Sequence, residues 1–340
     1  KDYDMKILVT GALGFVGSNL CEYYSQDANN IVVGIDNRFK LLGSNQNHKL
    51  IANVGTKFDY CDIRNMNDVE QIFLKYKGFD VVLHMAAQVA FKCSVENPRI
   101  DFEINTLGTF NLLEATRNHC PDATFIFAST NQVYGELKDE PIEEYNSRYD
   151  FVKLKTGVPE EYRLDFLSPY GCSKGAGDMY VQDYGRVYGM NTAVARFGGI
   201  YGVNQYSYED HGWISFISEQ VMKNQEFNRF GHGKQVRDIL YISDIVKAIS
   251  LMVDKISEIK GQAFNISGGP NNTLSVLELL TLLEDLTGYK EKSIINPMRR
   301  ADKIVMYLDI SKAERYLGWK PEIDKVQGIS KLLKWLAVRK

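Results

Sequence analysis

The sequence lacks the features that define several large classes of protein. Its five cysteines are scattered, odd in number and without a Cys-x-x-Cys pair, which argues against a disulfide framework and indicates reduced thiols. The five histidines are equally dispersed and form no His-Glu-x-x-His motif, so we predict no metal site. No run of about 18 apolar residues is present, which argues against a membrane span.

An excess of charge of one sign is also lacking. The chain carries 40 Lys and Arg against 43 Asp and Glu, a formal net charge of −3, so no basic field invites nucleic acid. The segment Lys1 to Met5 is too short for a signal peptide, and we expect a cytoplasmic protein without a membrane partner. What is present is a chain of 340 residues, 44% of them hydrophobic, enough for one large or two modest domains.

Apolar runs alternate with helical patterns through the first two thirds of the chain. Predicted strands lie at 6–9, 31–35, 57–58, 81–83, 124–127 and 192–195, and predicted helices at 15–24, 66–76, 101–118 and 171–188. This alternation predicts an α/β fold with a doubly wound parallel sheet, joined to a smaller mixed α/β domain at the carboxyl edge of that sheet. We expect the first domain at 1–195 and 236–266, and the second at 196–235 and 267–340.

A glycine-rich turn, "TGALGFVG", follows the first predicted strand. Gly11, Gly14 and Gly17 allow a tight turn and a close approach to phosphate, and the helix that follows offers N–H groups to a pyrophosphate. Asp36 ends the next strand, where its carboxylate can accept both ribose hydroxyls and oppose a 2′-phosphate, although the nearby Arg38 could favour one. The pattern predicts a Rossmann-type site for NAD.

Other strand ends are expected to line the same site. Asp62 follows the third strand and could contact the adenine or simply cap the next helix. "HMAAQ", residues 84–88, ends the fourth strand with small residues, and Asn105 faces that edge, where a structural role is common. The predicted cofactor contacts are Gly11, Gly14, Phe15, Val16, Gly17, Asp36, Asn37, Asp62, Ile63, Ala86, Ala87, Gln88, Asn105, Tyr170 and Lys174.

The stretch "SPYGCSK" places Tyr170 and Lys174 at i and i+4, on one face of a helix. Ser168 suits the N-cap of that helix and Pro169 its first position. An ammonium group beside a phenol favours the phenolate, as does a cationic nicotinamide, and we expect the two together to lower the pKa of Tyr170. The phenolate could then remove a proton from a substrate hydroxyl.

Together "TGALGFVG", Asp36, "STNQVYG" (129–135) and "YGCSK" resemble the extended short-chain dehydrogenases/reductases that act on nucleotide sugars. The resemblance covers essentially the whole chain. It implies that Thr130, Tyr170 and Lys174 form a catalytic triad and that Ser129 is a structural hydrogen-bonding residue.

The two residues after Thr130 bear on the type of reaction. The resemblance implies that 4,6-dehydratases carry Asp-Glu there, whereas this chain has Asn131 and Gln132, which do not titrate. We therefore expect an epimerase that recycles NAD. A catalytically silent NAD-binding regulatory protein is the alternative from another class, and the intact triad argues against it.

Longer stretches at 101–116, 164–180, 208–213 and 233–240 resemble the 2-epimerases of CDP-sugars, which implies a CDP-hexose substrate; a UDP-hexose 4-epimerase is the alternative. A polar and aromatic insertion within 136–167 is of unknown role. The resemblance also implies a homodimer, or a homotetramer, formed through the helices at 101–118 and 170–188, with Met179, Tyr180, Tyr184 and Tyr188 as apolar surface. The predicted substrate contacts are Gln88, Asn131, Gln132, His211, Trp213, Arg237 and Arg299.

Overall fold

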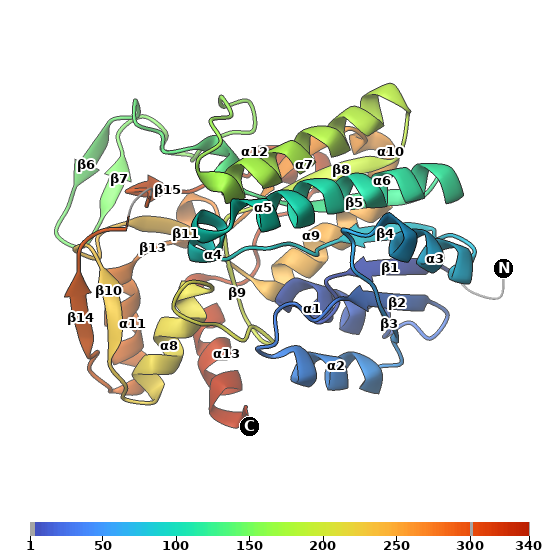
Figure 1. The fold of residues 1–340 in the computed structure, drawn as a ribbon. Coiled ribbons are helices and arrows are strands. Elements are labelled where there is room, and N and C mark those ends of the chain that lie inside the picture. The colour runs from blue at the N-terminus through green and yellow to red at the C-terminus, as the bar shows by residue number, and fades with distance from the viewer. Residues whose placement is uncertain (1–3, 300–301, 340) are drawn as a thin grey trace. The chain divides into compact units, whose positions relative to one another are not determined.

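The computed structural model describes residues 4–299 and 302–339, and their contacts divide the chain into two compact units (Figure 1). Unit 1 is drawn from residues up to Thr130, from 168–196 and from 246–264. Unit 2 is drawn from 131–167, 197–245 and 265 onward. Each unit is therefore built from segments that are far apart in the sequence.

Unit 1 is organised around a seven-stranded sheet with the order β12-β8-β5-β4-β1-β2-β3. The β1 strand pairs in parallel with β2 on one side and with β4 on the other, so the strand order reverses there, and in open α/β sheets ligands bind at the carboxyl ends of the strands at such a point. This sheet confirms the predicted doubly wound fold. The strands are β1 (Lys6–Thr10), β2 (Ile31–Asp36), β3 (Lys57–Tyr60), β4 (Val81–His84), β5 (Thr124–Thr130), β8 (Thr192–Phe197) and β12 (Gln262–Ile266).

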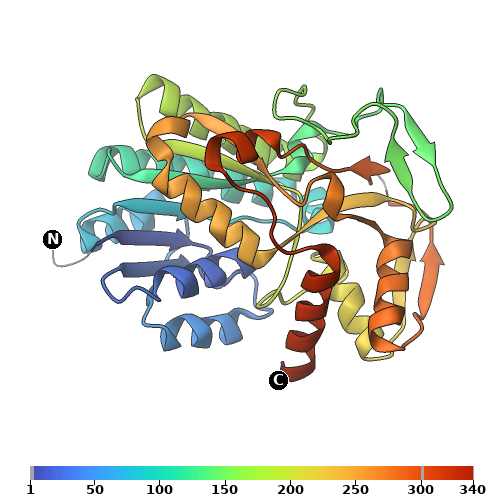
Figure 2. The ribbon, with the colours of Figure 1, turned by 180° about the vertical axis from the view of Figure 1, so that it is seen from behind.

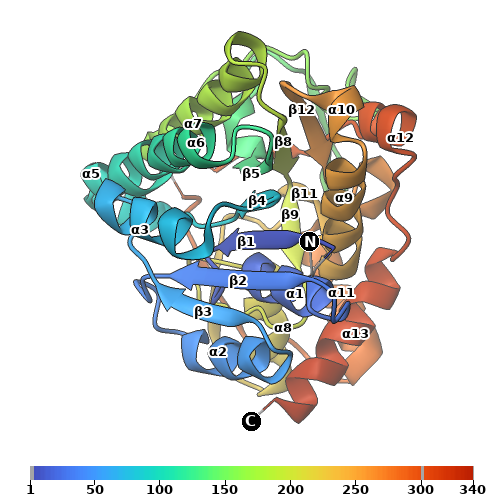
Figure 3. The same ribbon diagram turned by 90° about the vertical axis from the view of Figure 1, so that its right-hand side faces the viewer.

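Helices cover both faces of this sheet. The helices α3 (Met66–Tyr76), α6 (Gly108–His119) and α7 (Ser168–Val187) lie on one face, and Figure 3 shows them side by side. The helix α1 (Phe15–Tyr24) and residues 246–254 of α9 (Ile242–Asp254) cover the opposite face, as the reverse view in Figure 2 shows. The remaining helices of unit 1 are α2 (Ser44–Asn53), α4 (Phe91–Glu96), α5 (Pro98–Asp101) and α10 (Ile256–Ile259).

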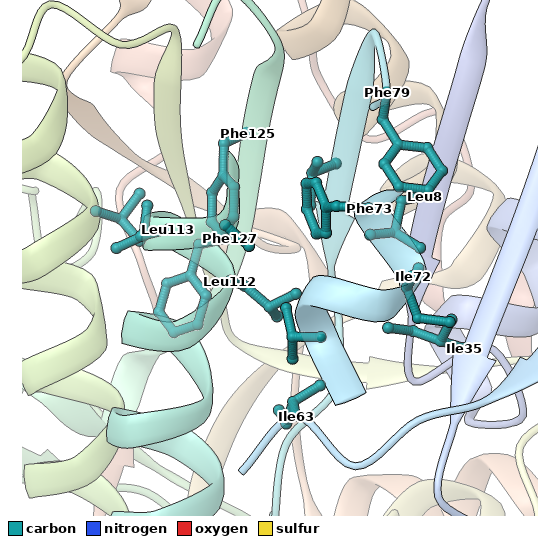
Figure 4. Packing of buried hydrophobic residues seen from close by; sticks show 14 of the residues in the cluster. Leu8, Ile35, Ile63, Ile72, Phe73, Phe79, Leu112, Leu113, Phe125 and Phe127 are labelled. Carbon is teal, nitrogen blue, oxygen red and sulfur yellow. The ribbon is translucent and has the colours of Figure 1, made fainter. Parts of the chain in front are cut away.

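The main core lies between the sheet and the helices α3 and α6 (Figure 4). Leu8 and Phe125 from the strands meet Phe73 from α3 and Leu112 from α6, and all four are essentially buried. The rings of Phe73 and Phe79 meet edge to face, 5.3 Å between centroids. Burial of each such side chain stabilises the fold by roughly 1.5–3 kcal/mol, which fixes the strands whose ends carry the site.

The expected helix over 101–118 is interrupted in the structure. It consists of α5, a π-helical turn η1 (Phe102–Leu107) and α6. Thr109, in the first turn of α6, donates its hydroxyl to the carbonyl oxygen of Asn105 in the π-helical turn at 2.6 Å. Turns of this kind inside helices are frequent at functional sites, and Asn105 lies in the middle of this one.

Unit 2 is a mixed α/β unit, as predicted. Strands β13, β11 and β15 form one sheet with β9 also paired to β11, and β10 pairs with β14. Its strands are β9 (Gly199–Tyr201), β10 (Phe227–Phe230), β11 (Val236–Tyr241), β13 (Thr273–Ser275), β14 (Ser293–Asn296) and β15 (Val305–Met306), and its helical elements are η2 (Asn131–Tyr134), α8 (Trp213–Met222), η3 (Pro270–Asn272), α11 (Val276–Thr287), α12 (Ser311–Leu317) and α13 (Lys325–Val338).

The insertion forms an antiparallel pair, β6 (Ile142–Glu144) and β7 (Tyr149–Phe151), within unit 2. The rings of Phe151 and Tyr307 lie 5.0 Å apart, and Tyr307 donates its hydroxyl to Asp150 at 2.8 Å. Residues from 133 to 158 share a buried cluster with residues of β11 and β15. Because of this packing, segment 131–167 lies in unit 2 and not in the first domain where we expected it, and so does 236–245.

Candidate active site

The glycine turn brings backbone segments into close contact at the end of β1. Gly11 has φ +67°, and a Cβ on Gly17 would lie 2.1 Å from the carbonyl oxygen of Gly11. The helix α1 has Gly14 at its N-cap, no side chain that caps it, and no acidic residue in its first turn, which begins with Phe15 and Val16. Its first N–H groups thus remain for an anion, and this cradle fits a dinucleotide pyrophosphate.

The carboxylate of Asp36 is held beside this turn. It accepts hydrogen bonds from the backbone N–H groups of Leu13, at 3.2 Å, and Arg38, at 2.7 Å. Burial raises the pKa of Asp36, and these hydrogen bonds act against that rise. The position of Asp36 after β2 fits a ribose that lies along the glycine turn.

The residues after β3 have other partners. Asp62 accepts from Nε and Nη2 of Arg64, with 2.6 Å between Nη2 and Oδ2. The hydrogen bond with Arg64 lowers the pKa of Asp62, and one with Asn37 also lowers it. Asn65, and not Asp62, caps helix α3 through the N–H of Asn67. The Ile63 side chain belongs to the core, so only its backbone could face a cofactor. A contact between Asp62 and an adenine stays a prediction.

The loop after β4 is held together by amide side chains. The N–H groups of Met85 and Ala86 donate to the hydroxyl of Thr10 at 3.1 and 3.0 Å. Asn105 exchanges two hydrogen bonds of 2.9 Å with the backbone of Gln88. Ala87 follows directly in this loop, and the close packing of small residues here fits the predicted approach of a cofactor.

Gln88 itself is turned inward. Its Nε2 donates to the carbonyl of Ala90 at 3.0 Å and to Asp101 at 2.7 Å, and its Oε1 accepts from the N–H of Ala90 at 2.6 Å. Only 6% of Gln88 is exposed. This arrangement favours a structural role for Gln88 over the predicted contact with a sugar, and Asn105 is structural in the same sense because its Nδ2 also donates to Ser173 at 3.0 Å.

The predicted triad comes together within unit 1. Thr130 is the last residue of β5, and its hydroxyl shares a hydrogen bond with the phenol of Tyr170 on α7. Lys174 lies one turn further along α7, is 2% exposed, and places its Nζ 4.1 Å from the centre of the Phe127 ring. The hydroxyl of Ser168 accepts from the N–H of Gly171 at 3.2 Å, as expected of a cap.

Burial dominates the electrostatics of the triad in the chain by itself. Burial raises the pKa of Tyr170 to about 12, and the hydrogen bond with Thr130 acts against this rise. Burial lowers the pKa of Lys174 to about 7, and Asp178 raises it in part. In the chain by itself the loss of water outweighs the favourable contacts, and the expected lowering of the Tyr170 pKa, which includes a cationic nicotinamide, stays a prediction.

A buried ion pair connects the segments that carry the triad. Asp178 accepts from Arg196 Nε at 2.9 Å, from Ser129 Oγ at 2.7 Å and from Gln182 at 2.6 Å. Asp178 is fully buried and Arg196 is 3% exposed. Ser129 is a structural residue, as expected, and it connects the end of β5 to α7.

Sequence reasoning missed Asp101. This carboxylate is fully buried at the end of α5, accepts from Gln88, and raises the pKa of Tyr170 through its charge. An aspartate between the apolar residues Ile100 and Phe102 was the one signal available. Its burial and its bond to Gln88 make it part of the framework and not an acid that a substrate could reach.

In unit 2, Asn131 and Gln132 open the short helix η2. Arg237 on β11 donates to Asp302 and to the carbonyl of Lys303, both at 2.6 Å. The carboxylate that pairs with Arg237 is therefore that of Asp302. An arginine that a carboxylate already orients is suited to bind a phosphate oxygen.

Arg299 also has partners within unit 2. Its Nη1 donates to Asp210 at 3.3 Å, and its guanidinium carbon lies 3.9 Å from the centre of the Phe230 ring. The backbones of His211 and Tyr208 form an isolated antiparallel β-bridge, and Trp213 is the first residue of helix α8. Both are half-buried. Their contact with a substrate stays a prediction.

Two expected absences can be compared with the structure. Among residues 4–299 and 302–339, no three His, Cys, Asp or Glu side chains gather as metal ligands would. In the same described ranges, every helix is too short or too polar to span a bilayer.

The chain is similar to known proteins along almost its whole length. The family model for GDP-mannose 4,6 dehydratase matches residues 8–332. A CDP-paratose 2-epimerase from Salmonella typhi is 39% identical over 97% of this chain and 99% of its own length, and a putative UDP-glucose 4-epimerase from Methanocaldococcus jannaschii is 34% identical over 97% and 98%. The solved UDP-glucose 4-epimerase from Thermus thermophilus, in complex with NAD, is 28% identical with a TM-score of 0.84 and covers 99% of this chain and all of its own.

Proposed function

The chain belongs to the GDP-mannose 4,6 dehydratase family of extended short-chain dehydrogenases/reductases, and from this premise we propose that it is an NAD-dependent epimerase of a nucleotide sugar. Its substrate is CDP-paratose or a close CDP-hexose, which it inverts at C2, so that CDP-paratose becomes CDP-tyvelose. The similarity to a CDP-paratose 2-epimerase along almost the whole of both chains supports cytosine as the nucleotide base and C2 as the carbon that is inverted.

One observation carries the choice of an epimerase over a dehydratase: Thr130, which hydrogen-bonds Tyr170, is followed by two amides. Elimination of water needs an acid and a base at the sugar, and Asn131 and Gln132 can supply neither. Asp101 cannot replace them, because it is fully buried and bonded to Gln88. A reversible oxidation needs one proton acceptor alone, and Tyr170 provides it.

The glycine turn, the N-terminus of α1 and Asp36 would hold the NAD, which when bound supplies the acceptor and donor of the hydride. Tyr170 takes the proton from the sugar hydroxyl at C2 and later returns it. Thr130 shares a hydrogen bond with the same hydroxyl and orients it. Lys174 holds the nicotinamide ribose. Between oxidation and reduction the 2-keto sugar rotates so that its other face is reduced, which inverts C2.

The raised pKa of Tyr170 fits this scheme. In the chain alone the phenol is protonated at neutral pH, because burial places its pKa at about 12. The positive charge of an oxidised nicotinamide next to it would favour the phenolate. The base would thus form where the oxidant is present, which limits unproductive proton transfer.

A UDP-hexose 4-epimerase is the second candidate, since relatives with 34% and 28% identity carry that description. Nuclear magnetic resonance of the products from CDP-paratose and from UDP-glucose separates the two. We expect inversion at C2 of the CDP-sugar. Inversion at C4 with C2 unchanged would refute the leading assignment and support the second.

A self-association face is part of the proposal. Phe110 on α6 and Tyr180 on α7 are exposed and pack edge to face, 5.9 Å between ring centres. Met179 is exposed on α7 as well, and so is Tyr188, which directly follows this helix. Tyr184 is an exception to our expectation, because it is buried and donates to Glu114 at 2.7 Å. An apolar pair of helices of this kind fits a homodimer, in which both helices of each copy would be covered.

A further inference from the structure

Lys303 is a buried lysine in unit 2 that the reaction described above does not use. It lies two residues before β15, is 2% exposed, and donates from Nζ to the carbonyl oxygen of Asn131 at 3.0 Å. A lysine is almost never buried this deeply unless an anion pairs with it. The contact that it makes here is with a neutral carbonyl, and buried ionisable groups in such surroundings are candidates for a functional role.

The charges around Lys303 disfavour its protonated form. Arg237 donates to the backbone carbonyl of Lys303, and its guanidinium charge acts on the Lys303 amine. In the described part of the chain, Asp302 is the carboxylate found to act on the Lys303 amine, and it is already bonded to Arg237. Burial, and then Arg237, hold the pKa of Lys303 well below its usual value. Once Lys303 is protonated, two cations face one carboxylate, which leaves room for an anion with more than one charge.

We propose that Lys303 is a positioning residue that takes up a proton when the substrate's diphosphate binds at Arg237, and that its ammonium then holds the carbonyl of Asn131. The inference rests on the proposed nucleotide-sugar function. A bound diphosphate adds negative charge beside Lys303 and favours its protonated form, and by linkage protonation favours the diphosphate. A hydrogen bond from an ammonium is stronger than one from a neutral amine.

The consequence concerns the catalytic end of β5. Asn131 follows Thr130 directly in the chain, so a firmer hold on its carbonyl restrains the backbone that carries the Thr130 hydroxyl. Small displacements of catalytic groups cost up to about a hundredfold in rate. Binding of the nucleotide end would therefore improve the alignment of the residue that orients the reacting hydroxyl.

The test is calorimetric titration of the protein with CDP at pH 8, in Tris and in HEPES, whose ionisation enthalpies differ. We expect proton uptake by the natural chain and none by Lys303→Met, with CDP affinity and kcat each lower by about tenfold or more. Lys303→Arg stays charged at this pH, so it should show no uptake while keeping more turnover than Lys303→Met. Lys234→Met is the matched control, because Lys234 pairs with Glu144 at 2.7 Å on the surface, and it should behave as the natural chain.

Several outcomes would overturn the inference. Absence of proton uptake in the natural chain refutes it, and so does uptake that persists in Lys303→Arg, the variant that remains informative if Lys303→Met does not fold. Inversion at C2 that is unaffected in Lys303→Met refutes the role of Lys303 and leaves the proposed function intact. Proton uptake with UDP and not with CDP would support the role of Lys303 and show that the substrate carries uracil and not cytosine. Binding of neither nucleotide would refute both the role of Lys303 and the proposed function.

Discussion

The buried ion pair behind the triad allows a quantitative prediction. Asp178→Asn removes the carboxylate charge that faces Arg196, whose Nε and Nη2 lie 2.9 and 3.1 Å from its oxygens. Both residues are almost fully buried, so the guanidinium would be left without a counter-charge in the interior. Loss of one partner of such a pair costs about 3–5 kcal/mol of the free energy of unfolding.

The same change should also affect Lys174, one helical turn before Asp178. The pKa of Lys174, about 7, is a balance between burial, which lowers it, and the Asp178 charge, which raises it. The other charged or titratable neighbours are Tyr170 and His84, and burial keeps His84 neutral because it lowers the pKa of that imidazole. Without Asp178 the ammonium loses its proton at a lower pH. We therefore expect the alkaline limb of the kcat profile to move to lower pH in Asp178→Asn.

Unfolding in urea should be followed by circular dichroism, because all three tryptophans lie in unit 2 while this ion pair lies in unit 1. Ser129→Ala is the control, since it removes one hydrogen bond to Asp178 and changes no charge. It should be less destabilised than Asp178→Asn and keep the natural pH profile. A loss of less than about 1 kcal/mol in Asp178→Asn, with an unchanged profile, would refute the reasoning.

Three further predictions follow from the site and the units. Tyr170→Phe should lower kcat by roughly 10²–10⁴-fold while NAD released on denaturation is unchanged; retained turnover would place the base elsewhere. Burial raises the pKa of Asp238 from 3.8 to about 6, so this group stabilises the fold below pH 4, and about 3 kcal/mol of that stability is lost as the pH rises through 6. Asp238→Asn should remove this part of the pH dependence of the free energy of unfolding, measured in urea. An unchanged dependence on pH would contradict the prediction. Tyr180→Glu places a charge on the exposed face of α7 and should convert the proposed dimer to monomer in analytical ultracentrifugation, whereas a mass unchanged from the natural chain would exclude this face.

The features that the sequence predicted well are those with local signals. The glycine turn, the Ser168 cap and the spacing of Tyr170 and Lys174 each follow from neighbouring residues, and the sheet follows from apolar runs of strand length. The features it did not predict depend on distant partners. Asn131 and Lys303 are 172 positions apart, and neither residue type indicates that the two would form a hydrogen bond. The raised pKa of Tyr170 is similar, because burial is a property of the whole unit.

The arrangement of helix α2 shows the same limit on a smaller scale. Its sequence, "SNQNHKLIAN", is polar and offers no clear apolar stripe, so no helix was predicted there. In the structure Asn47 donates from this helix to the carbonyl of Leu13 at 3.0 Å, beside the glycine turn. A contact made by a side-chain amide, and not burial of apolar surface, relates this helix to the cofactor site.

The strand order of unit 1 has a consequence for the synthesis of the protein. A ribosome would release β1 to β5 first, but the outer edge of β5 pairs with β8, which begins at Thr192, and β8 pairs with β12, which begins at Gln262. Until those residues emerge, the apolar edge "TFIFAST" has no strand beside it, and such edges template aggregation. A nascent chain that stops before Thr192 should therefore need a chaperone to remain soluble, whereas the finished chain should not.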